Sequence, residues 1–193
     1  DNGTISTDDF LAKLKRYGSK IKLVAITGAS NVTGYINDID FFACETHKIG
    51  AKILVDAAQL APHRPVDMKA NNKECMLDYL VFSAHKVYAP FGVGVLIGER
   101  ETFERGDPEE VGGGVVDIVT LEDAYWTDLP EKEEAGTPDI IGVVALAKVI
   151  QMIQQIGWDE IIRHEAQLTA YALEKLKEIP SVELYGDADP KNA

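Results

Sequence analysis

The sequence holds 193 residues, of which 46% are apolar, and its formal net charge is −13. This length suffices for one well-filled α/β domain, and the apolar content argues against a disordered chain. The acidic charge disfavours binding to nucleic acid or to an anionic membrane, because both would have to attract a polyanion. Cys44 and Cys75 show no spacing typical of a disulfide framework or a zinc site, and no signal or membrane segment is evident, so we expect a cytoplasmic protein.

The N-terminal part of the chain begins with a helix pattern and continues with a strand. Ser6 or Thr7 can cap a helix that Gly18 ends. The continuous apolar run at 21–26 predicts a strand that is buried on both faces, as is typical of parallel sheets. Asn37 is the candidate cap of the next helix.

Three further apolar runs, at 51–55, 78–82 and 93–97, predict strands. Between the first two, residues 57–67 predict an irregular segment and residues 68–74 a polar surface segment. The alternation of strands, helices and short loops is typical of an α/β fold with a mostly parallel sheet and helices on its faces.

The second half of the chain starts with an irregular region. Residues 99–138 are rich in glycine, proline and acidic side chains, and we interpret them as a long excursion that reaches a partner subunit. Residues 140–156 are apolar almost all round, which predicts a buried helix that Gly157 stops. Asp159 can cap a last amphipathic helix, and residues 182–185 predict the start of another strand.

Lys86 is the candidate catalytic residue. It follows the apolar run Leu80–Phe82 and the residues Ser83, Ala84 and His85. A lysine that is desolvated beside a buried strand has a neutral, nucleophilic amine, which can form a Schiff base with an aldehyde such as pyridoxal phosphate. The alternative is an ordinary solvated lysine, and Lys86 alone does not decide between the two.

Polar residues also follow the first two strands, at the sheet edge where open α/β folds bind ligands. Asp56 follows a buried strand and needs a cation, for which the protonated ring nitrogen of pyridoxal phosphate is suitable, but a helix cap or an ion pair is the alternative. Gln59 and Asn31 could hydrogen-bond the ring oxygen; the alternatives are a surface amide for Gln59 and an Asx-turn for Asn31.

Three residues are candidates for binding a phosphate. Ser83 and His85 could donate hydrogen bonds to it, whereas the alternative is a backbone-paired serine and a core histidine. Thr137 precedes a helix and could present its hydroxyl to an anion, or could simply cap that helix. The run 112–114, three glycines, matches neither a P-loop nor a GxGxxG fingerprint, and we interpret it as a hinge or a close-approach loop.

The order of these motifs resembles the class V pyridoxal-phosphate enzymes (fold type I), and most closely the cysteine desulfurase and selenocysteine lyase group. The matching segments are Ser30–Gly34, Asp56–Gln59, Ser83–Lys86, Gly112–Gly114 and Glu134–Pro138. The resemblance implies pyridoxal 5'-phosphate as the cofactor, with Lys86 forming the internal aldimine and moving protons. It further implies that Asp56 pairs with the pyridinium, that Gln59 and Asn31 contact the ring oxygen, and that Ser83 and His85 contact the phosphate.

The same resemblance implies the partners and the domain organisation. Thr137 would reach the phosphate of the neighbouring subunit in a homodimer, the substrate would be a small amino acid, and a sulfur-acceptor protein would take the product. We expect residues 1–180 to be a partial cofactor-binding large domain and residues 181–193 to start the connection to a small C-terminal domain.

Several departures from the family pattern leave the reaction open. In this family a ring-stacking histidine lies upstream of the region matching Asp1, and the substrate arginine and nucleophilic cysteine lie downstream of Ala193. Neither Cys44 nor Cys75 takes the place of that cysteine. Ala89-Pro90-Phe91 differs from the usual Gly-Pro-Thr, and Lys132-Glu133 from Arg-Phe. A desulfurase is therefore the first hypothesis, with a class V aminotransferase or epimerase, or a chain that folds and dimerises without turnover, as the alternatives.

Overall fold

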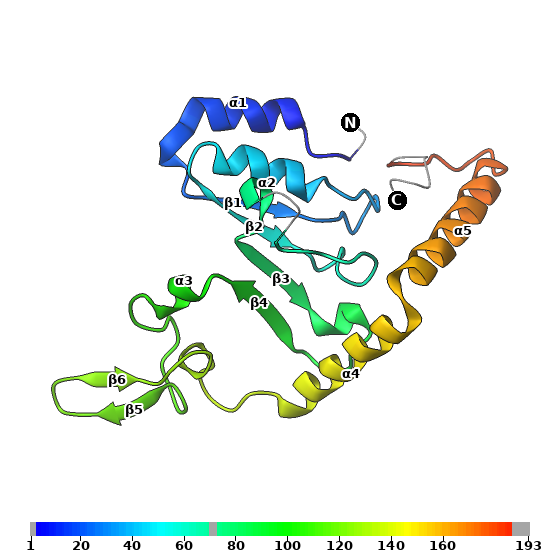
Figure 1. Ribbon diagram of the computed structural model, residues 1–193. Helices are drawn as coiled ribbons and strands as arrows, with labels where there is room; N and C mark the ends of the chain where they lie inside the picture. Colours follow the sequence, from blue (N-terminus) through cyan, green and yellow to red (C-terminus); the bar gives the residue numbers. More distant parts are fainter. Residues whose placement is uncertain (1–2, 70–72, 187–193) are drawn as a thin grey trace.

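The computed structural model describes residues 3–69 and 73–186. Five α-helices and six strands occur in these ranges (Figure 1). The helices are α1 (Thr7–Tyr17), α2 (Ile39–His47), α3 (Arg100–Glu104), α4 (Ile140–Ile156) and α5 (Trp158–Lys177). The strands are β1 (Leu23–Thr27), β2 (Lys52–Asp56), β3 (Tyr79–Ser83), β4 (Gly94–Gly98), β5 (Val116–Val119) and β6 (Ala124–Trp126). Short 3₁₀ turns are η1 (Gly18–Lys20), η2 (Lys73–Cys75), η3 (Ala84–Val87) and η4 (Glu131–Glu133).

The main sheet has the strand order β1-β2-β3-β4. β1, β2 and β3 are parallel, and β4 is antiparallel to β3. The predicted mostly parallel α/β fold is confirmed. The parallel part places the carboxyl ends of β1, β2 and β3 at one edge of the sheet, where the chain leaves each strand.

One face of the sheet carries the core. Register and alternation place Ile53, Val55, Leu80 and Phe82 on this face, and α1 and α2 cover its β1–β3 part. Leu146 of α4 covers its β4 side. On the opposite face α3 contacts β3, where the hydroxyls of Tyr79 and Thr102 lie 2.7 Å apart. The rest of that face is open, with Leu23, Leu54 and Leu96 half-exposed or exposed.

Helix ends show where local sequence decided the fold. The Ser6 hydroxyl accepts a hydrogen bond from the Asp9 amide, and Gly18 ends α1, as predicted. The cap of α2 is Asp38, which accepts from the Phe41 amide at 3.0 Å, so the prediction of Asn37 is wrong by one residue. Asn37 is buried instead, and its side-chain amide donates to the Thr27 carbonyl at 2.9 Å.

Four expectations on burial and boundaries are wrong. β1 is not buried on both faces, because it lies at the sheet edge and alternates between exposed and half-buried residues. Helix α4 is mostly exposed, since only one side of it contacts the sheet, and Ile141 remains 69% exposed. Gly157, not Asp159, caps α5, and residues 182–185 form no strand.

The excursion at 99–138 contains more structure than its sequence pattern indicates. The antiparallel hairpin β5–β6 projects away from the main sheet, at the lower left of Figure 1. Lys132 is buried, and its Nζ donates to the carbonyls of Phe103 at 2.9 Å and Gly106 at 2.7 Å, which ties the excursion to the end of α3. These bonds satisfy carbonyls that the end of a helix leaves unpaired.

The two C-terminal helices meet at a sharp bend. α4 and α5 join at Gly157, whose φ is 88°, and their axes differ by 80°. Within the described ranges, a single helix long and apolar enough to span a membrane does not occur. Only this bent pair, taken together, passes that length and composition test.

Candidate functional site

Polar side chains follow the parallel strands at the carboxyl edge of the sheet. Thr27 and Asp56 are register partners, and Asp56 is the register partner of Val81, two residues before Ser83. Because side chains alternate along a strand, Thr27, Asp56 and Ser83 lie on the same face, the one that the core helices leave open. The structure therefore brings together Asp56 and Ser83, two predicted site residues that are 27 positions apart.

Asp56 is held by the backbone around it. Its Oδ1 accepts a hydrogen bond from the Ala58 amide at 2.9 Å, and its carbonyl accepts one from the Gly28 amide at 2.7 Å. Within the described part of the chain, Asp56 has no ion pair, so that alternative is not met. The bond from the Ala58 amide, at the start of the helical turn that follows, is the capping contact of the other alternative. Asp56 is exposed rather than at the edge of a dry interior, which corrects the burial argument. Its Oδ2 remains available to a cationic ligand.

Lys86 lies on η3, directly beyond β3. Ala84 and Val87 of this turn are buried, and the Ala84 amide donates to the Val93 carbonyl at 2.8 Å. These contacts fix the backbone of the turn, while His85 and Lys86 between them are exposed. The expectation that Lys86 is desolvated is therefore not met in this chain, and the alternative of His85 as a core histidine is wrong.

The amides of Asn31 and Gln59 line one cavity, of about 390 Å³. The Ser30 hydroxyl, not Asn31, organises the turn after β1, since it accepts from the amides of Val32 and Thr33, both at 3.2 Å. The Asx-turn alternative for Asn31 is therefore not met. Both residues line a space that the loops after β1 and β2 share with α5.

The segment after β2 forms a helical turn, although its sequence predicts an irregular stretch. The Ala61 amide donates to the Ala57 carbonyl at 2.8 Å, and the Arg64 amide to the Leu60 carbonyl at 2.9 Å. A Cβ on Gly28 would lie 2.8 Å from Leu60, so glycine is what allows this turn to approach the end of β1. The close approach brings Gln59 beside the Asn31 loop.

Helix α5 holds the end of this turn through a contact that no sequence motif indicates. The carboxylate of Glu165 lies 2.7 Å from His63 Nδ1 and accepts from Arg64 Nη1 at 2.8 Å. His63, Arg64 and Glu165 line the same cavity as Asn31 and Gln59. The separation of about 100 residues leaves no local signal by which the sequence could have predicted this cluster.

Thr137 lies apart from the other predicted site residues. It is exposed in the loop before α4, and the helix cap is Asp139, whose carboxylate accepts from the Gly142 amide at 2.9 Å. The helix-cap alternative for Thr137 is therefore wrong. No hydrogen bond or ion pair links Thr137 to Asp56, Ser83 or Lys86 within residues 3–69 and 73–186. The glycine run contacts the same loop, since the Gly136 amide donates to the Gly113 carbonyl at 2.8 Å.

The opposite end of β2 and β3 carries a network of paired charges. Asp78, with a side chain that is 10% exposed, accepts from Lys52 Nζ at 3.1 Å and from the Ile53 amide at 2.8 Å, and it pairs with His47 Nε2 at 2.8 Å. Burial acts to raise the pKa of Asp78, but these hydrogen bonds outweigh burial and lower it. The ion pair with Glu99 raises the pKa of Lys52.

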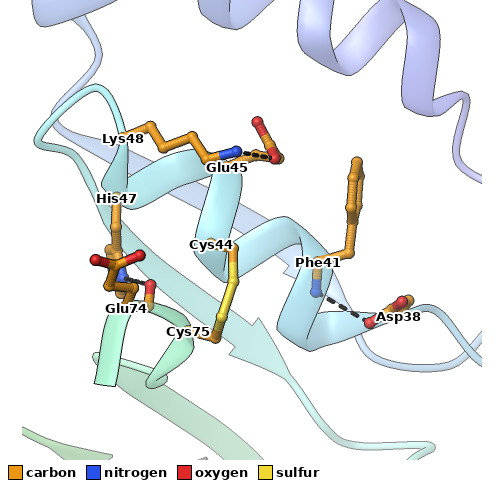
Figure 2. Close-up of a disulfide and its surroundings, with 8 residues drawn as sticks. All are labelled: Asp38, Phe41, Cys44, Glu45, His47, Lys48, Glu74 and Cys75. Carbon is orange, nitrogen blue, oxygen red and sulfur yellow. Dashed lines mark hydrogen bonds and ion pairs between the residues drawn. A yellow bond between two sulfur atoms is a disulfide. The ribbon is translucent and has the colours of Figure 1, made fainter. Parts of the chain in front are cut away.

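A disulfide joins Cys44 of α2 to Cys75 of η2 beside this network (Figure 2). The expectation of unpaired cysteines is therefore wrong: residues 31 apart in sequence become neighbours because α2 packs beside η2. His47 reinforces the link, since its Nδ1 lies 2.7 Å from the Glu74 carbonyl. Among the described residues, no cluster could hold a metal ion.

The residues at the carboxyl edge suit a phosphorylated aromatic aldehyde with a basic ring nitrogen. Asp56 offers an unpaired carboxylate oxygen, Lys86 a primary amine, and Ser83 a hydroxyl that makes no hydrogen bond in the described part of the chain. These groups come from adjacent strand ends on a rigid backbone. A ligand that contacts all three groups would be held by several polar contacts.

Comparisons with known proteins give one consistent family. The sequence model described as aminotransferase class-V matches residues 1–193. A probable cysteine desulfurase of Halalkalibacterium halodurans is 42% identical over 96% of this chain and 44% of its own length. The chain spans about half the length of the curated relatives it matches.

Solved structures agree with the sequence comparison. The apo cysteine desulfurase of Thermococcus onnurineus NA1 superposes with a TM-score of 0.79 at 34% identity, over 99% of this chain and 46% of that one. The cysteine desulfurase CsdA of Escherichia coli gives a TM-score of 0.79 at 29% identity, over 95% of this chain and 45% of that one.

Proposed function

The chain belongs to the class V aminotransferase family, and from this premise we propose that it is the cofactor-binding part of a pyridoxal-phosphate-dependent cysteine desulfurase. The observation that carries the proposal is the common placement of Asp56 and Ser83 on one open face, with Lys86 on the turn directly beyond. The names of the similar proteins support the reaction. When bound, the cofactor supplies an aldehyde for covalent attachment and a ring that accepts electrons from the substrate.

Each residue has a role that follows from its position. The amine of Lys86 would hold the cofactor aldehyde and, once released, would move a proton at the substrate α-carbon. The Oδ2 of Asp56 would keep the ring nitrogen protonated, because a carboxylate stabilises a nearby cation. Ser83 and His85 donate to the phosphate, which offsets the acidic charge of the chain locally.

The amides of Gln59 and Asn31 are assigned to the ring oxygen. Their common cavity supports this assignment, since both residues line the same space from different loops. The substrate is then a small amino acid, L-cysteine, and its sulfur passes to an acceptor outside this chain.

The assembly is also a proposal. We infer a homodimer in which Thr137 reaches the neighbouring site, because Thr137 is exposed and, within the described residues, makes no hydrogen bond to Asp56, Ser83 or Lys86 of its own chain. Light scattering of the full-length protein tests this inference, and a monomeric mass would contradict it. We propose the cytoplasm as the location on the absence of an evident signal segment alone, because the Cys44–Cys75 disulfide removes the argument from unpaired cysteines. Fractionation of the producing cell is the measurement.

The test of the cofactor assignment compares Lys86→Ala with Lys20→Ala in the full-length protein. Lys20 is an exposed lysine remote from the carboxyl edge, which makes it a matched control. With pyridoxal phosphate added, we expect an absorbance band near the edge of the visible range in the wild type and in Lys20→Ala, and its loss in Lys86→Ala. Borohydride reduction followed by peptide mass spectrometry should place the cofactor on Lys86.

Product analysis separates the desulfurase from its relatives. With L-cysteine, a desulfurase yields alanine and sulfide in the presence of a reductant. A keto acid without sulfide would instead assign an aminotransferase, and racemised substrate an epimerase. A band that persists in Lys86→Ala would overturn the cofactor assignment itself.

A further inference from the structure

The helical turn at 57–64 carries Gln59 and is fixed at both ends. At its start, Asp56 Oδ1 accepts from the Ala58 amide at 2.9 Å. At its end, two successive residues, His63 and Arg64, bind the carboxylate of Glu165. Gln59 lies between these two contacts, three residues after Asp56 and four before His63.

Glu165 uses both of its carboxylate oxygens for this contact. Oε1 faces His63 Nδ1 at 2.7 Å, and Oε2 accepts from Arg64 Nη1 at 2.8 Å. Arg64 Nη1 also donates to the His63 carbonyl at 2.8 Å, which closes the cluster onto the backbone of the turn. The side chains of Glu165 and Arg64 are 25% and 20% exposed, so water screens this pair less than a surface ion pair.

Leu168, the apolar residue of α5 in the cavity that it shares with the turn, is 55% exposed. No residue of α5 is fully buried in this chain. A polar contact that uses two side chains of the turn therefore sets the distance between the turn and α5. A binding group must be held to within about 0.5 Å to keep its geometry, and contacts around it supply that precision.

We propose that Glu165 is a positioning residue, which holds the 57–64 turn through His63 and Arg64 so that Gln59 faces Asn31 across their common cavity. This inference rests on the proposed function, since it gives the position of Gln59 a purpose in binding the cofactor. Glu165 itself need not touch the cofactor.

Hydrogen exchange in the cofactor-free full-length protein tests directly whether Glu165 stabilises the 57–64 turn. Glu165→Gln keeps the shape of the side chain but removes its charge, and Glu165→Asp keeps the charge on a shorter side chain. We expect the amides of Ala61 and Arg64 to exchange about ten-fold faster in Glu165→Gln, with a smaller change in Glu165→Asp. Glu174→Gln, on the same helix and with a side chain that is 70% exposed, is the matched control and should leave these amides unchanged.

Cofactor affinity tests the consequence for the site. We expect the Kd for pyridoxal phosphate to rise about ten-fold in Glu165→Gln. In a Gln59→Ala background the same substitution should add no further loss, because Glu165 acts through Gln59. A merely structural role would lower affinity equally in both backgrounds.

The outcomes separate this inference from the proposed function. Unchanged amide exchange, unchanged affinity, or equal losses with and without Gln59 would each overturn the positioning role, although the wild type still binds the cofactor. A wild-type protein without any Lys86-dependent band would overturn the proposed function and, with it, the purpose assigned to Glu165.

Discussion

The two ends of the β2–β3 strand pair carry charge in opposite ways. At the end where the strands begin, Asp78 is nearly buried and binds Lys52, His47 and a backbone amide. At the end where they finish, Asp56 is exposed with one hydrogen bond to its carboxylate, and Lys86 beyond β3 has no ion pair within the described ranges. The difference indicates that one end stabilises the fold and the other retains free charges for a ligand.

Matched substitutions at the two ends test whether they contribute differently to stability. In Asp78→Ala we expect a loss of about 3 kcal/mol in the free energy of unfolding, because the Ile53 amide and two partly exposed partners, Lys52 and His47, lose a charged acceptor. In Asp56→Ala we expect a loss of about 1 kcal/mol or less, since one hydrogen bond of an exposed group is removed. Urea unfolding of both variants measures the difference, and equal losses would show that the two ends do not differ.

The disulfide beside Asp78 should also contribute to the stability of this end. Replacing both Cys44 and Cys75 by alanine should lower the free energy of unfolding by about 3 kcal/mol, because the unfolded chain loses a cross-link that closes a loop. A reductant should lower the stability of the wild type by a similar amount and leave the double variant unchanged. Detection of two free thiols in the purified, unreduced protein would contradict the pairing.

Acid should weaken the stabilised end selectively. The pKa of Asp78 lies below its ordinary value of 3.8, so its contribution to stability is present above that value and is lost as the pH falls through the lower folded-state pKa. The stability difference between the wild type and Asp78→Asn should therefore be constant above about pH 5 and shrink below pH 4. A difference that stays constant down to pH 3 would show that the charge of Asp78 contributes nothing.

The sequence predicts best what depends on local pattern. Apolar runs located β2 and β3 to within a residue, and the polar residues at their ends, Asp56 and Ser83, lie on a common face because the period of a strand is two. The cap of α2 shows the limit of local reasoning. Asn37 and Asp38 are both good caps, and only the tertiary bond from Asn37 to Thr27 decides between them.

Features that depend on distant contacts could not be predicted. Glu165 contacts His63 and Arg64 across about 100 residues of sequence, and the periodicity of a helix or strand carries no information on contacts so far apart. The same reason hides the pairing of Cys44 with Cys75. The prediction for helix α4 is wrong because its apolar composition indicates burial. Burial depends on what packs against the helix, and its own residues do not specify that.

The backbone conformation of Gly157 determines the direction in which α5 leaves α4. Its φ of 88° is strained for any residue with a side chain, so glycine sets the angle between α4 and α5. Glu165 lies eight positions after Gly157, or about 12 Å along α5 at 1.5 Å per residue. A rotation of α5 by about 10° at Gly157 would therefore move Glu165 by about 2 Å. That displacement exceeds the tolerance of a hydrogen bond. A glycine outside the cavity thereby sets the distance between α5 and the turn that carries Gln59.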